Sequence, residues 1–523
     1  MPGFHVENFG CRAARADGEA VSDRLRAAGH CMQQPREAEV IVVNTCSVTA
    51  EADREARAYI RRAHRLNPEA RIVVTGCYAQ RAPEELATLA GVSAVVGNSH
   101  KALAPQIALN LTASKGTGLS SYITGPHQIS GTLAHEGAPS FVPLDSLVST
   151  LAPIFADDRF AHSFLEDAQL VPGRQTRPNL KIQEGCGNRC TFCVIPQTRG
   201  GSRSLSAKAV LKQITGFVAA GGNELVLSGI NLGRWGRDLV DQDLCSPTLS
   251  QTARNDGAPA SRGSTLAALV HRIFAETDLP RMRLSSIEPM DWNDAMIALM
   301  QEFGGTRLSR HAHLPLQSGS DAVLRRMHRR YRPWHYAEKV AALIRAAGPE
   351  LTLGADVMVG FPGETDLEFE ETLELVRALP FGYLHLFPFS PRPGTRAWAL
   401  HAASPVPPAV VDERMAALRT LAAEKARAHR EQFIGRELDA ITLHTPENMV
   451  SRGRTHALTE SFLPVEIDGA LPANRLVCLR VTGMNAEMTL EGAFLPTGSP
   501  PNRSQVSRQR PAIRSSRQTE PML

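Results

Sequence analysis

The chain has 523 residues, of which 43% are apolar and 21% are charged, and its formal net charge is +4. This length predicts about three domains, and the small excess of positive charge permits an RNA partner without indicating one. No apolar run reaches the roughly 18 residues of a membrane span, and the N-terminus lacks the pattern of a signal peptide. We therefore expect a cytoplasmic protein that contacts no membrane.

The first predicted domain covers residues 2–111. Residues 39–46 (EVIVVNTC) and 70–77 (ARIVVTGC) are nearly continuous runs of apolar, mostly β-branched side chains, which is typical of buried parallel strands. The segment between them has the charged amphipathic pattern of a helix and ends before Pro68. This alternation predicts a doubly wound α/β domain.

The second predicted domain covers residues 172–402 and follows a segment, 112–171, that is rich in Gly, Ser, Pro and Thr. We interpret that segment as a linker or insertion, mostly irregular surface chain. Strand-like runs then alternate with helical segments, which predicts a closed or partial β/α barrel with ligand loops at the carboxyl ends of its strands. The strand-like runs cover 223–229, 281–289, 311–319, 352–364 and 383–391.

The remaining chain is predicted to form a connecting helix, a small barrel and a tail. Residues 403–432 have a charged helical pattern. Residues 433–496 contain short strand-like runs, among them HALTESFLPVEID (456–468), and predict a small β-barrel. Residues 497–523 are rich in Arg, Ser and Pro and are predicted to be disordered.

Three of the nine cysteines lie in the run CGNRCTFC, with the spacing C-x3-C-x2-C at Cys186, Cys190 and Cys193. Three thiolates on one short loop can hold three irons of a cubane cluster and leave the fourth iron open to a small molecule. A zinc knuckle completed by a distant ligand is the alternative, although zinc sites more often use paired C-x2-C hooks. Disulfides are not expected in a reducing compartment.

A second set, Cys11, Cys46 and Cys77, is dispersed in the sequence, but each cysteine ends a strand-like run. The carboxyl ends of parallel strands meet at one edge of a doubly wound sheet, so these thiols are expected to converge there. They could hold a second cluster, or they could be inert core cysteines. The other three cysteines, Cys31, Cys245 and Cys478, are interpreted as ordinary thiols.

The chain contains, in this order, the motifs FGCR, VVNTCSVT, VVTGCYAQ, IQEGCGNRCTFCVIP, RGGSRS, RLSSIEP, HLPLQSGSDAVLRRM and GFPGET. Together they resemble the methylthiotransferase family of radical S-adenosylmethionine (SAM) enzymes. The resemblance implies a SAM-binding 4Fe–4S cluster on Cys186, Cys190 and Cys193, and a second 4Fe–4S cluster on Cys11, Cys46 and Cys77. It also implies that the C-terminal barrel is a TRAM-like RNA-binding domain. One departure is Ala14, where the family usually has Asn.

The resemblance also suggests the substrate. The stretch CSVTAEAD is similar to the branch that methylthiolates N6-threonylcarbamoyladenosine next to the tRNA anticodon. Isopentenyladenosine of tRNA and an aspartate of a ribosomal protein are the alternatives with the same chemistry. A redox-sensing iron–sulfur protein that binds RNA is the alternative without catalysis. The tRNA substrate would contact arginines of the barrel, for which the candidates are Arg452, Arg454, Arg475 and Arg480.

The family pattern further implies which residues hold SAM, with no catalytic side chain beyond the cluster ligands. Ser228, Gly229 and Asn231 are expected at its methionyl amino group, and Ser286 and Glu288 at its ribose hydroxyls. Gln317 and Ser318 are expected at its carboxylate, and Gly360 and Gly363 at its adenine. The glycines could instead only make turns, and Glu288 could be a surface ion-pair partner. The reaction also needs an electron donor and a sulfur source, and the sequence identifies neither; it does not predict an oligomeric state.

Overall fold

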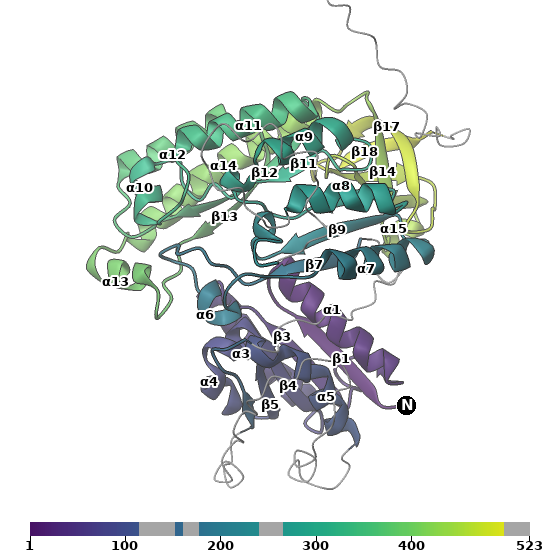
Figure 1. Ribbon diagram of the computed structural model, residues 1–523, viewed down its shortest axis with the longest axis vertical. Helices are drawn as coiled ribbons and strands as arrows, with labels where there is room; N and C mark the ends of the chain where they lie inside the picture. Colours follow the sequence, from purple (N-terminus) through teal and green to yellow (C-terminus); the bar gives the residue numbers. More distant parts are fainter. Residues whose placement is uncertain (114–151, 161–176, 240–264, 496–523) are drawn as a thin grey trace, which may run out of the picture.

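The computed structural model describes residues 1–113, 152–160, 177–239 and 265–495. It contains an N-terminal α/β module, a central module of strands covered by helices, and a C-terminal barrel (Figure 1). The fold class predicted from the sequence is therefore confirmed. Predictions for the tail 497–523, for Cys245 and for most of the segment 112–171 fall outside the described residues.

The N-terminal module is a six-stranded sheet in the order β2-β1-β3-β4-β5-β6, with parallel pairing throughout. Strand β3 is apolar along its length because it is buried on both sides. Its alternate residues enter the hydrophobic cores on the two faces of the sheet. The strands are β1 (Gly3–Asn8), β2 (Cys31–Met32), β3 (Val40–Thr45), β4 (Arg71–Gly76), β5 (Val92–Gly97) and β6 (Ile154–Phe155). The helices are α1 (Arg12–Ala27), α2 (Ala50–Leu66), α3 (Cys77–Arg81), α4 (Pro83–Ala87), η1 (Asn98–Leu103) and α5 (Ala104–Ala113).

Strand β6 lies within the segment 112–171, for which a mostly irregular linker or insertion is predicted. It pairs in parallel with β5, Val95 with Ile154 and Val96 with Phe155, and so extends the edge of the N-terminal sheet. Two residues are too short a run to show strand periodicity, so this strand could not be recognised from the sequence. The N-terminal module thus includes chain from beyond residue 111.

The central module is a partial β/α barrel. Its strands follow one another in space as β10-β9-β7 and β11-β12-β13, all parallel, with β8 antiparallel at one edge. The two sheets approach each other through the bridge between Met282 and Leu308. The strands are β7 (Asn179–Glu184), β8 (Arg203–Ser204), β9 (Glu224–Gly229), β10 (Arg281–Leu284), β11 (His311–His313), β12 (Thr352–Val359) and β13 (Phe381–Pro388).

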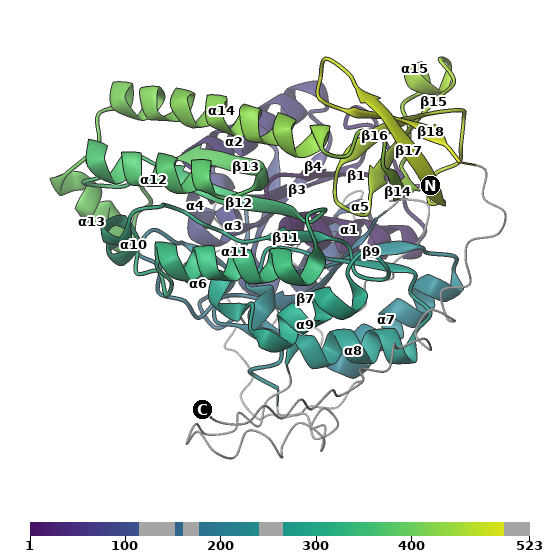
Figure 2. The ribbon, with the colours of Figure 1, turned by 90° about the horizontal axis from the view of Figure 1, so that it is seen from above.

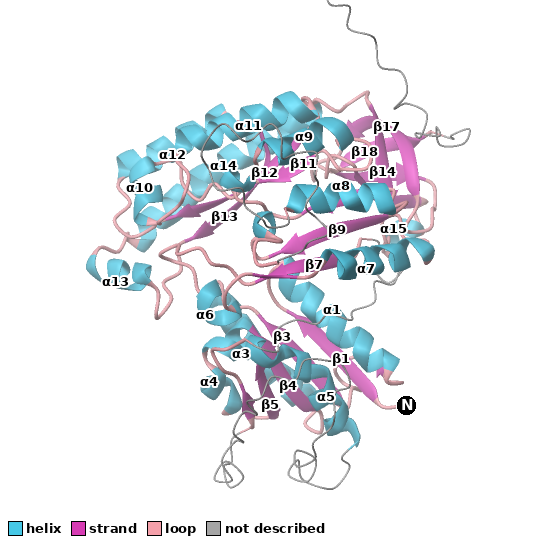
Figure 3. Ribbon diagram, viewed as in Figure 1, coloured by secondary structure: helices cyan, strands magenta, loops and turns pink. Residues whose placement is uncertain are grey.

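Helices cover the outside of these strands (Figure 3). Four of the five strand-like runs extend beyond the observed strands, because β10, β11, β12 and β13 end at Leu284, His313, Val359 and Pro388. The helices are α6 (Ile195–Arg199), α7 (Ala207–Ala219), η4 (Leu232–Arg234), α8 (Leu266–Glu276), η7 (Pro289–Asp291), α9 (Asp294–Phe303), α10 (Asp321–Arg326), α11 (Pro333–Ala347), α12 (Asp366–Ala378) and α13 (Arg396–Ala403).

Helix α14 (Pro408–Glu431) crosses the central module and leads into a closed barrel of order β14-β15-β16-β18-β17 (Figure 2). The run 456–468 forms two strands rather than one, because the chain turns at Phe462, whose φ is +65°. Arg283 joins this barrel to the central module by donating to the carbonyls of Thr459 (2.7 Å) and Glu460 (3.1 Å). The elements are β14 (Glu437–Thr442), α15 (Glu447–Val450), β15 (Arg454–Thr459), β16 (Pro464–Asp468), β17 (Leu476–Met484) and β18 (Leu490–Phe494).

Candidate active site at two cysteine loops

The first cysteine set lies in the loop between β7 and α6. The backbone N–H of Asn188 points at Cys186 Sγ, and that of Ile195 points at Cys193 Sγ, each at 3.4 Å. Cys190 Sγ accepts from the Arg329 guanidinium at 3.3 Å. Hydrogen bonds of this kind stabilise thiolate charge and tune the potential of an iron–sulfur cluster.

The protonation of these thiols supports a metal-binding role. Burial raises the pKa of Cys193 to about 12, and the neighbouring Cys190 and Cys186 act in the same direction. Without a metal, burial and the neighbouring sulfurs disfavour the thiolate form of Cys193. Iron supplies the missing positive charge, so the residues present fit a cluster that displaces the thiol protons.

The second cysteine set lies where three neighbouring strands of the N-terminal sheet end. Cys11 follows β1, Cys46 follows β3, and Cys77 is the first residue of α3 after β4. Burial, and after it the neighbouring Cys77 and Cys11, raise the pKa of Cys46 to about 12. The structure thus brings together the residues that the strand-end argument selected.

A glycine keeps the second set compact. A Cβ on Gly10, whose φ is +101°, would lie 2.8 Å from Cys46 Sγ.

Nearby Ala14 is buried, and its carbonyl accepts a hydrogen bond from Asn44. In neither set do three side chains of the described residues converge as tightly as a single metal ion requires.

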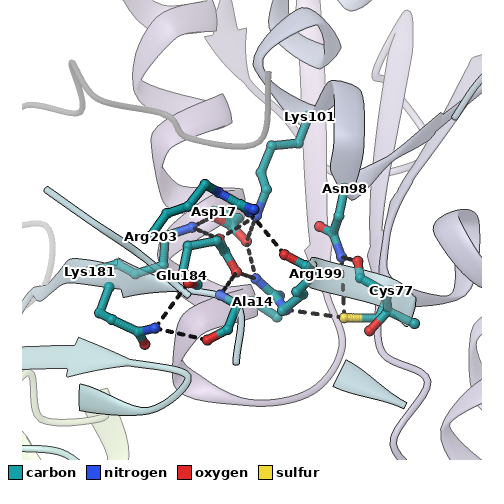
Figure 4. A network of polar contacts seen from close by, with 12 residues as sticks. Ala14, Asp17, Cys77, Asn98, Lys101, Lys181, Glu184, Arg199 and Arg203 are labelled. Carbon is teal, nitrogen blue, oxygen red and sulfur yellow. Dashed lines mark hydrogen bonds and ion pairs between the residues drawn. The ribbon is translucent and has the colours of Figure 1, made fainter. Parts of the chain in front are cut away.

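Cys77 is the point at which the second set meets the central module. Its Sγ accepts from Arg199 Nε at 3.3 Å and from Asn98 Nδ2 at 3.4 Å (Figure 4). Arg199 is fully buried and ends α6, the helix whose first N–H donates to Cys193. One short helix therefore contacts both cysteine sets.

Arg199 belongs to a buried ionic network between the two modules, shown in Figure 4. Its Nη1 lies 2.7 Å from Glu184 and 3.2 Å from Asp17, and Lys101 bridges the same two carboxylates at 2.7 and 3.0 Å. Lys181 also contacts both. Three cations thus face two carboxylates, which leaves one positive charge beside Cys77.

The electrostatics of this network agree with its geometry. Burial alone would raise the pKa of Glu184, but Arg199, Lys101 and Lys181 hold it well below its usual value. Burial would lower the pKa of Arg199, but Cys77 and then Glu184 and Asp17 raise it well above its usual value. Both groups are therefore charged in the folded protein, and the network is ionic.

Three of the residues predicted to bind SAM have buried polar atoms with no hydrogen-bond partner among the described residues. These atoms are Ser228 Oγ, Asn231 Oδ1 and Gln317 Oε1. Asn231 Nδ2 also lies 3.5 Å from Cys186 Sγ, which places this side chain next to the first cysteine set. Buried polar atoms are costly unless they are hydrogen-bonded, so these residues fit a polar ligand beside the cluster loop.

Two further predicted residues contact side chains of the central module, and one of them is linked to a cysteine. Ser286 Oγ is 2.8 Å from His313 Nδ1. Glu288 is paired with Arg329 at 3.1 Å, and Arg329 in turn donates to Cys190. Glu288 is therefore not a surface ion-pair partner, which was the alternative considered for it.

The other predicted SAM contacts have roles within the fold. Ser318 Oγ is bonded to Thr372 (3.1 Å), and the N–H groups of Gly360 and Gly363 donate to Glu364 (2.8 Å) and Ser404 (2.9 Å). A Cβ on Gly360 would meet Val411 of α14 at 2.6 Å, and one on Gly229 would meet Gln183 at 2.9 Å. These residues shape the loops, and their contact with SAM stays a prediction.

Sequence reasoning missed Arg199 and Arg329 as partners of the cysteine sulfurs. Arg199 is 122 positions from Cys77, and Arg329 is 139 positions from Cys190. No spacing rule relates such distant residues. One general rule could have pointed to them: a buried arginine almost always has a partner. This rule can be applied only when the burial of each arginine is known.

Comparison with known proteins agrees with the architecture described above. Residues 3–97 match the family model described as Uncharacterized protein family UPF0004, and residues 180–376 match the Radical SAM superfamily. The radical SAM methyltransferase TsrM from Kitasatospora setae, solved with cobalamin and a 4Fe–4S cluster bound, has a similar fold. Its TM-score is 0.50 at 14% identity, over 76% of this chain and 77% of that chain.

Curated relatives are similar over nearly the whole chain. The threonylcarbamoyladenosine tRNA methylthiotransferase MtaB of Bacillus subtilis is 32% identical over 89% of this chain and 90% of its own length. The tRNA-2-methylthio-N(6)-dimethylallyladenosine synthase of a Parafrankia species is 30% identical over 94% and 85%. The zinc-knuckle and redox-sensor alternatives do not fit these matches, and the chain belongs to the methylthiotransferase family of radical SAM enzymes.

Proposed function

We propose that this enzyme converts N6-threonylcarbamoyladenosine in tRNA to its 2-methylthio derivative. Five curated relatives with 29–32% identity are named for this reaction. The observation that carries the proposal is the pair of cysteine sets, joined through α6 and lying on either side of one module boundary. A reaction that breaks a C–H bond and then inserts sulfur needs two such centres.

The first cysteine set would hold the SAM-cleaving 4Fe–4S cluster, and the second set would hold another 4Fe–4S cluster that provides the sulfur. Bound SAM with its cluster supplies a carbon radical able to remove hydrogen from an unactivated aromatic carbon. Ser228 and Asn231 would orient the methionyl end of SAM, because their buried polar atoms have no other partner among the described residues. Arg329 and two backbone N–H groups stabilise the thiolates of the first set.

Nucleoside mass spectrometry tests the substrate. Deletion of the gene is expected to remove 2-methylthio-N6-threonylcarbamoyladenosine from total tRNA, and its restoration is expected to return it. Cells in which that nucleoside persists would contradict the proposal. The same samples report the second candidate, dimethylallyladenosine, which is favoured by relatives with 30% and 33% identity. A ribosomal-protein aspartate would be tested by mass spectrometry of the ribosome.

Cysteine variants test the division of labour between the two sets. In Cys46→Ala we expect SAM cleavage to continue while methylthiolation stops, because the first set is intact. In Cys186→Ala both activities are expected to stop. Methylthiolation by Cys46→Ala would show that the second set has no role in sulfur transfer.

The C-terminal barrel would bind the tRNA, as expected for a TRAM-like domain. Of its four candidate arginines, Arg454 and Arg480 are paired with Asp468 (3.0 Å) and Glu437 (2.7 Å). Arg452 and Arg475 are exposed and make no side-chain ion pair within the described part of the chain. We therefore assign phosphate contact to Arg452 and Arg475. No helix among the described residues is long and apolar enough to cross a membrane.

A further inference from the structure

Arg12 is a cation in an unexpected place. It directly follows Cys11 and is the first residue of α1, whose first turn contains no acidic side chain. The positive end of the helix dipole disfavours a cation at this position. The Arg12 side chain is exposed, and within the described residues it makes no ion pair or hydrogen bond. No acidic side chain of the described residues therefore neutralises its charge.

Arg12 lies at the meeting point of the three modules. Its guanidinium is 5.6 Å from the ring centroid of Phe462, in the C-terminal barrel. The Phe462 ring is in turn 5.6 Å from that of Tyr383, on β13 of the central module. We call Phe462, Tyr383, His313 and His385 the junction cluster. His313 and His385 lie 6.0 and 5.2 Å from the Tyr383 ring.

The junction cluster connects the two halves of the active site. At one end, Arg12 is the chain neighbour of Cys11, in the second cysteine set. At the other end, His313 is hydrogen-bonded to Ser286, in the loop expected to hold SAM. Aromatic and histidine rings of this kind are the surfaces on which unstacked bases lie in RNA-binding proteins. A base placed against the junction cluster would have Arg12 at one end and Ser286 at the other.

Of the two arginines that lie over Phe462 in the described part of the chain, Arg12 is the one free to bind an anion. Arg283 also lies over this ring, but it is paired with Glu224 at 2.6 Å and bonded to two carbonyls. The junction cluster also contacts a carboxylate, that of Asp356, which lies 3.5 Å from His313. A neutral isopentenyl group would leave the Arg12 guanidinium without a partner.

We propose that Arg12 binds the carboxylate of the threonylcarbamoyl group, while the junction cluster holds the adenine. This inference rests on the proposed function and adds the residue that distinguishes the acidic modified base from a neutral one. An arginine suits the task because its planar guanidinium can donate two parallel hydrogen bonds to a carboxylate. Arg12 would thus be a specificity residue of the substrate site.

The test pairs a change in the enzyme with a change in the substrate. Wild type and Arg12→Gln are assayed on tRNA carrying threonylcarbamoyladenosine and on the same tRNA with that carboxylate methyl-esterified. For wild type we expect esterification to lower kcat/KM by about 10- to 100-fold, mainly through KM, as for loss of a charged hydrogen bond. For Arg12→Gln we expect the two tRNAs to differ by less than about 3-fold.

Controls separate this role from support of the neighbouring cysteines. Arg36→Gln removes an exposed arginine of the same module and should behave as wild type. Arg12→Lys, which keeps the charge, should retain part of the discrimination. Filter binding of the two tRNAs repeats the comparison without requiring intact clusters, and iron content is measured for each variant.

The outcomes are distinct. If Arg12→Gln keeps the full effect of esterification, or if wild type shows none, the assignment of Arg12 is wrong although the proposed function stands. If Arg12→Gln loses iron and is impaired equally on both tRNAs, Arg12 serves the cysteine set and the inference is also wrong. If wild type modifies only dimethylallyladenosine, the proposed function and this inference fail together.

Discussion

Arg199 connects the chemistry of the second cysteine set with the stability of the module boundary. In Arg199→Gln, the hydrogen bond to Cys77 is removed and two buried carboxylates lose a partner. Lys101 and Lys181 still balance these carboxylates, so we expect the free energy of unfolding to fall by about 1.5–3 kcal/mol, as for loss of a charged hydrogen bond. Urea unfolding measures this change.

The same substitution should weaken iron binding at the second set. Measured in a Cys186→Ala background, where only the second set counts, the iron content of Arg199→Gln is expected to fall. Arg189→Gln, an exposed arginine of the cluster loop, is the matched control and should change neither property. Unchanged iron in Arg199→Gln would show that Cys77 does not depend on the guanidinium.

Ser228 shows what an unsatisfied buried atom predicts. Its hydroxyl has no partner among the described residues, so Ser228→Ala should leave Tm unchanged or raise it. It should nevertheless weaken SAM binding by about 5- to 10-fold, as for loss of a neutral hydrogen bond. Calorimetry and equilibrium dialysis with SAM measure the two effects. The Ser318 hydroxyl is bonded to Thr372, so Ser318→Ala should instead lower Tm. If Ser228→Ala lowers Tm and Ser318→Ala weakens SAM binding, Ser318 binds SAM and Ser228 supports the fold.

At the scale of elements, the turn between β4 and α3 depends on Gly76. Its φ is +101°, and a Cβ there would lie 2.3 Å from the Thr45 carbonyl oxygen. We expect Gly76→Ala to lower the free energy of unfolding by more than about 2 kcal/mol, because backbone strain and steric overlap act together. Gly29→Ala is the control, since its φ is +86° but a Cβ there meets nothing within 4 Å. Equal losses in the two variants would show that crowding at Thr45 is unimportant.

How far the sequence predicts this protein also depends on the kind of element. Strands such as β3 and β4 were predictable because parallel strands buried on both faces are apolar throughout. The convergence of Cys11, Cys46 and Cys77 followed from sheet topology alone. Arg199 and Arg12 were not predictable as site residues, because their partners lie in other modules. Contacts between modules depend on how the folded modules dock against each other, and a local sequence pattern does not predict this docking.

At the scale of the whole molecule, the C-terminal barrel is expected to set the salt dependence of tRNA binding. If Arg452 and Arg475 each bind one phosphate, Arg452→Gln or Arg475→Gln should flatten the slope of log K against log salt by about 0.7–0.9. Filter binding at several salt concentrations measures the slope. Arg480→Gln is the control, because that side chain is already paired with Glu437. If all three variants keep the wild-type slope, the barrel does not bind the phosphates through these arginines.

The buried network at the module boundary carries one positive charge in excess, and this restricts which modules of related proteins can be joined to each other. The N-terminal module contributes Asp17 and Lys101, which balance, whereas the central module contributes Lys181, Glu184 and Arg199, which do not. The excess positive charge lies beside Cys77, where the thiolate of a bound cluster would balance it. A chimaera that takes its N-terminal third from a relative therefore inherits a working boundary only if that third brings its own cysteine anion and a matched acid–base pair.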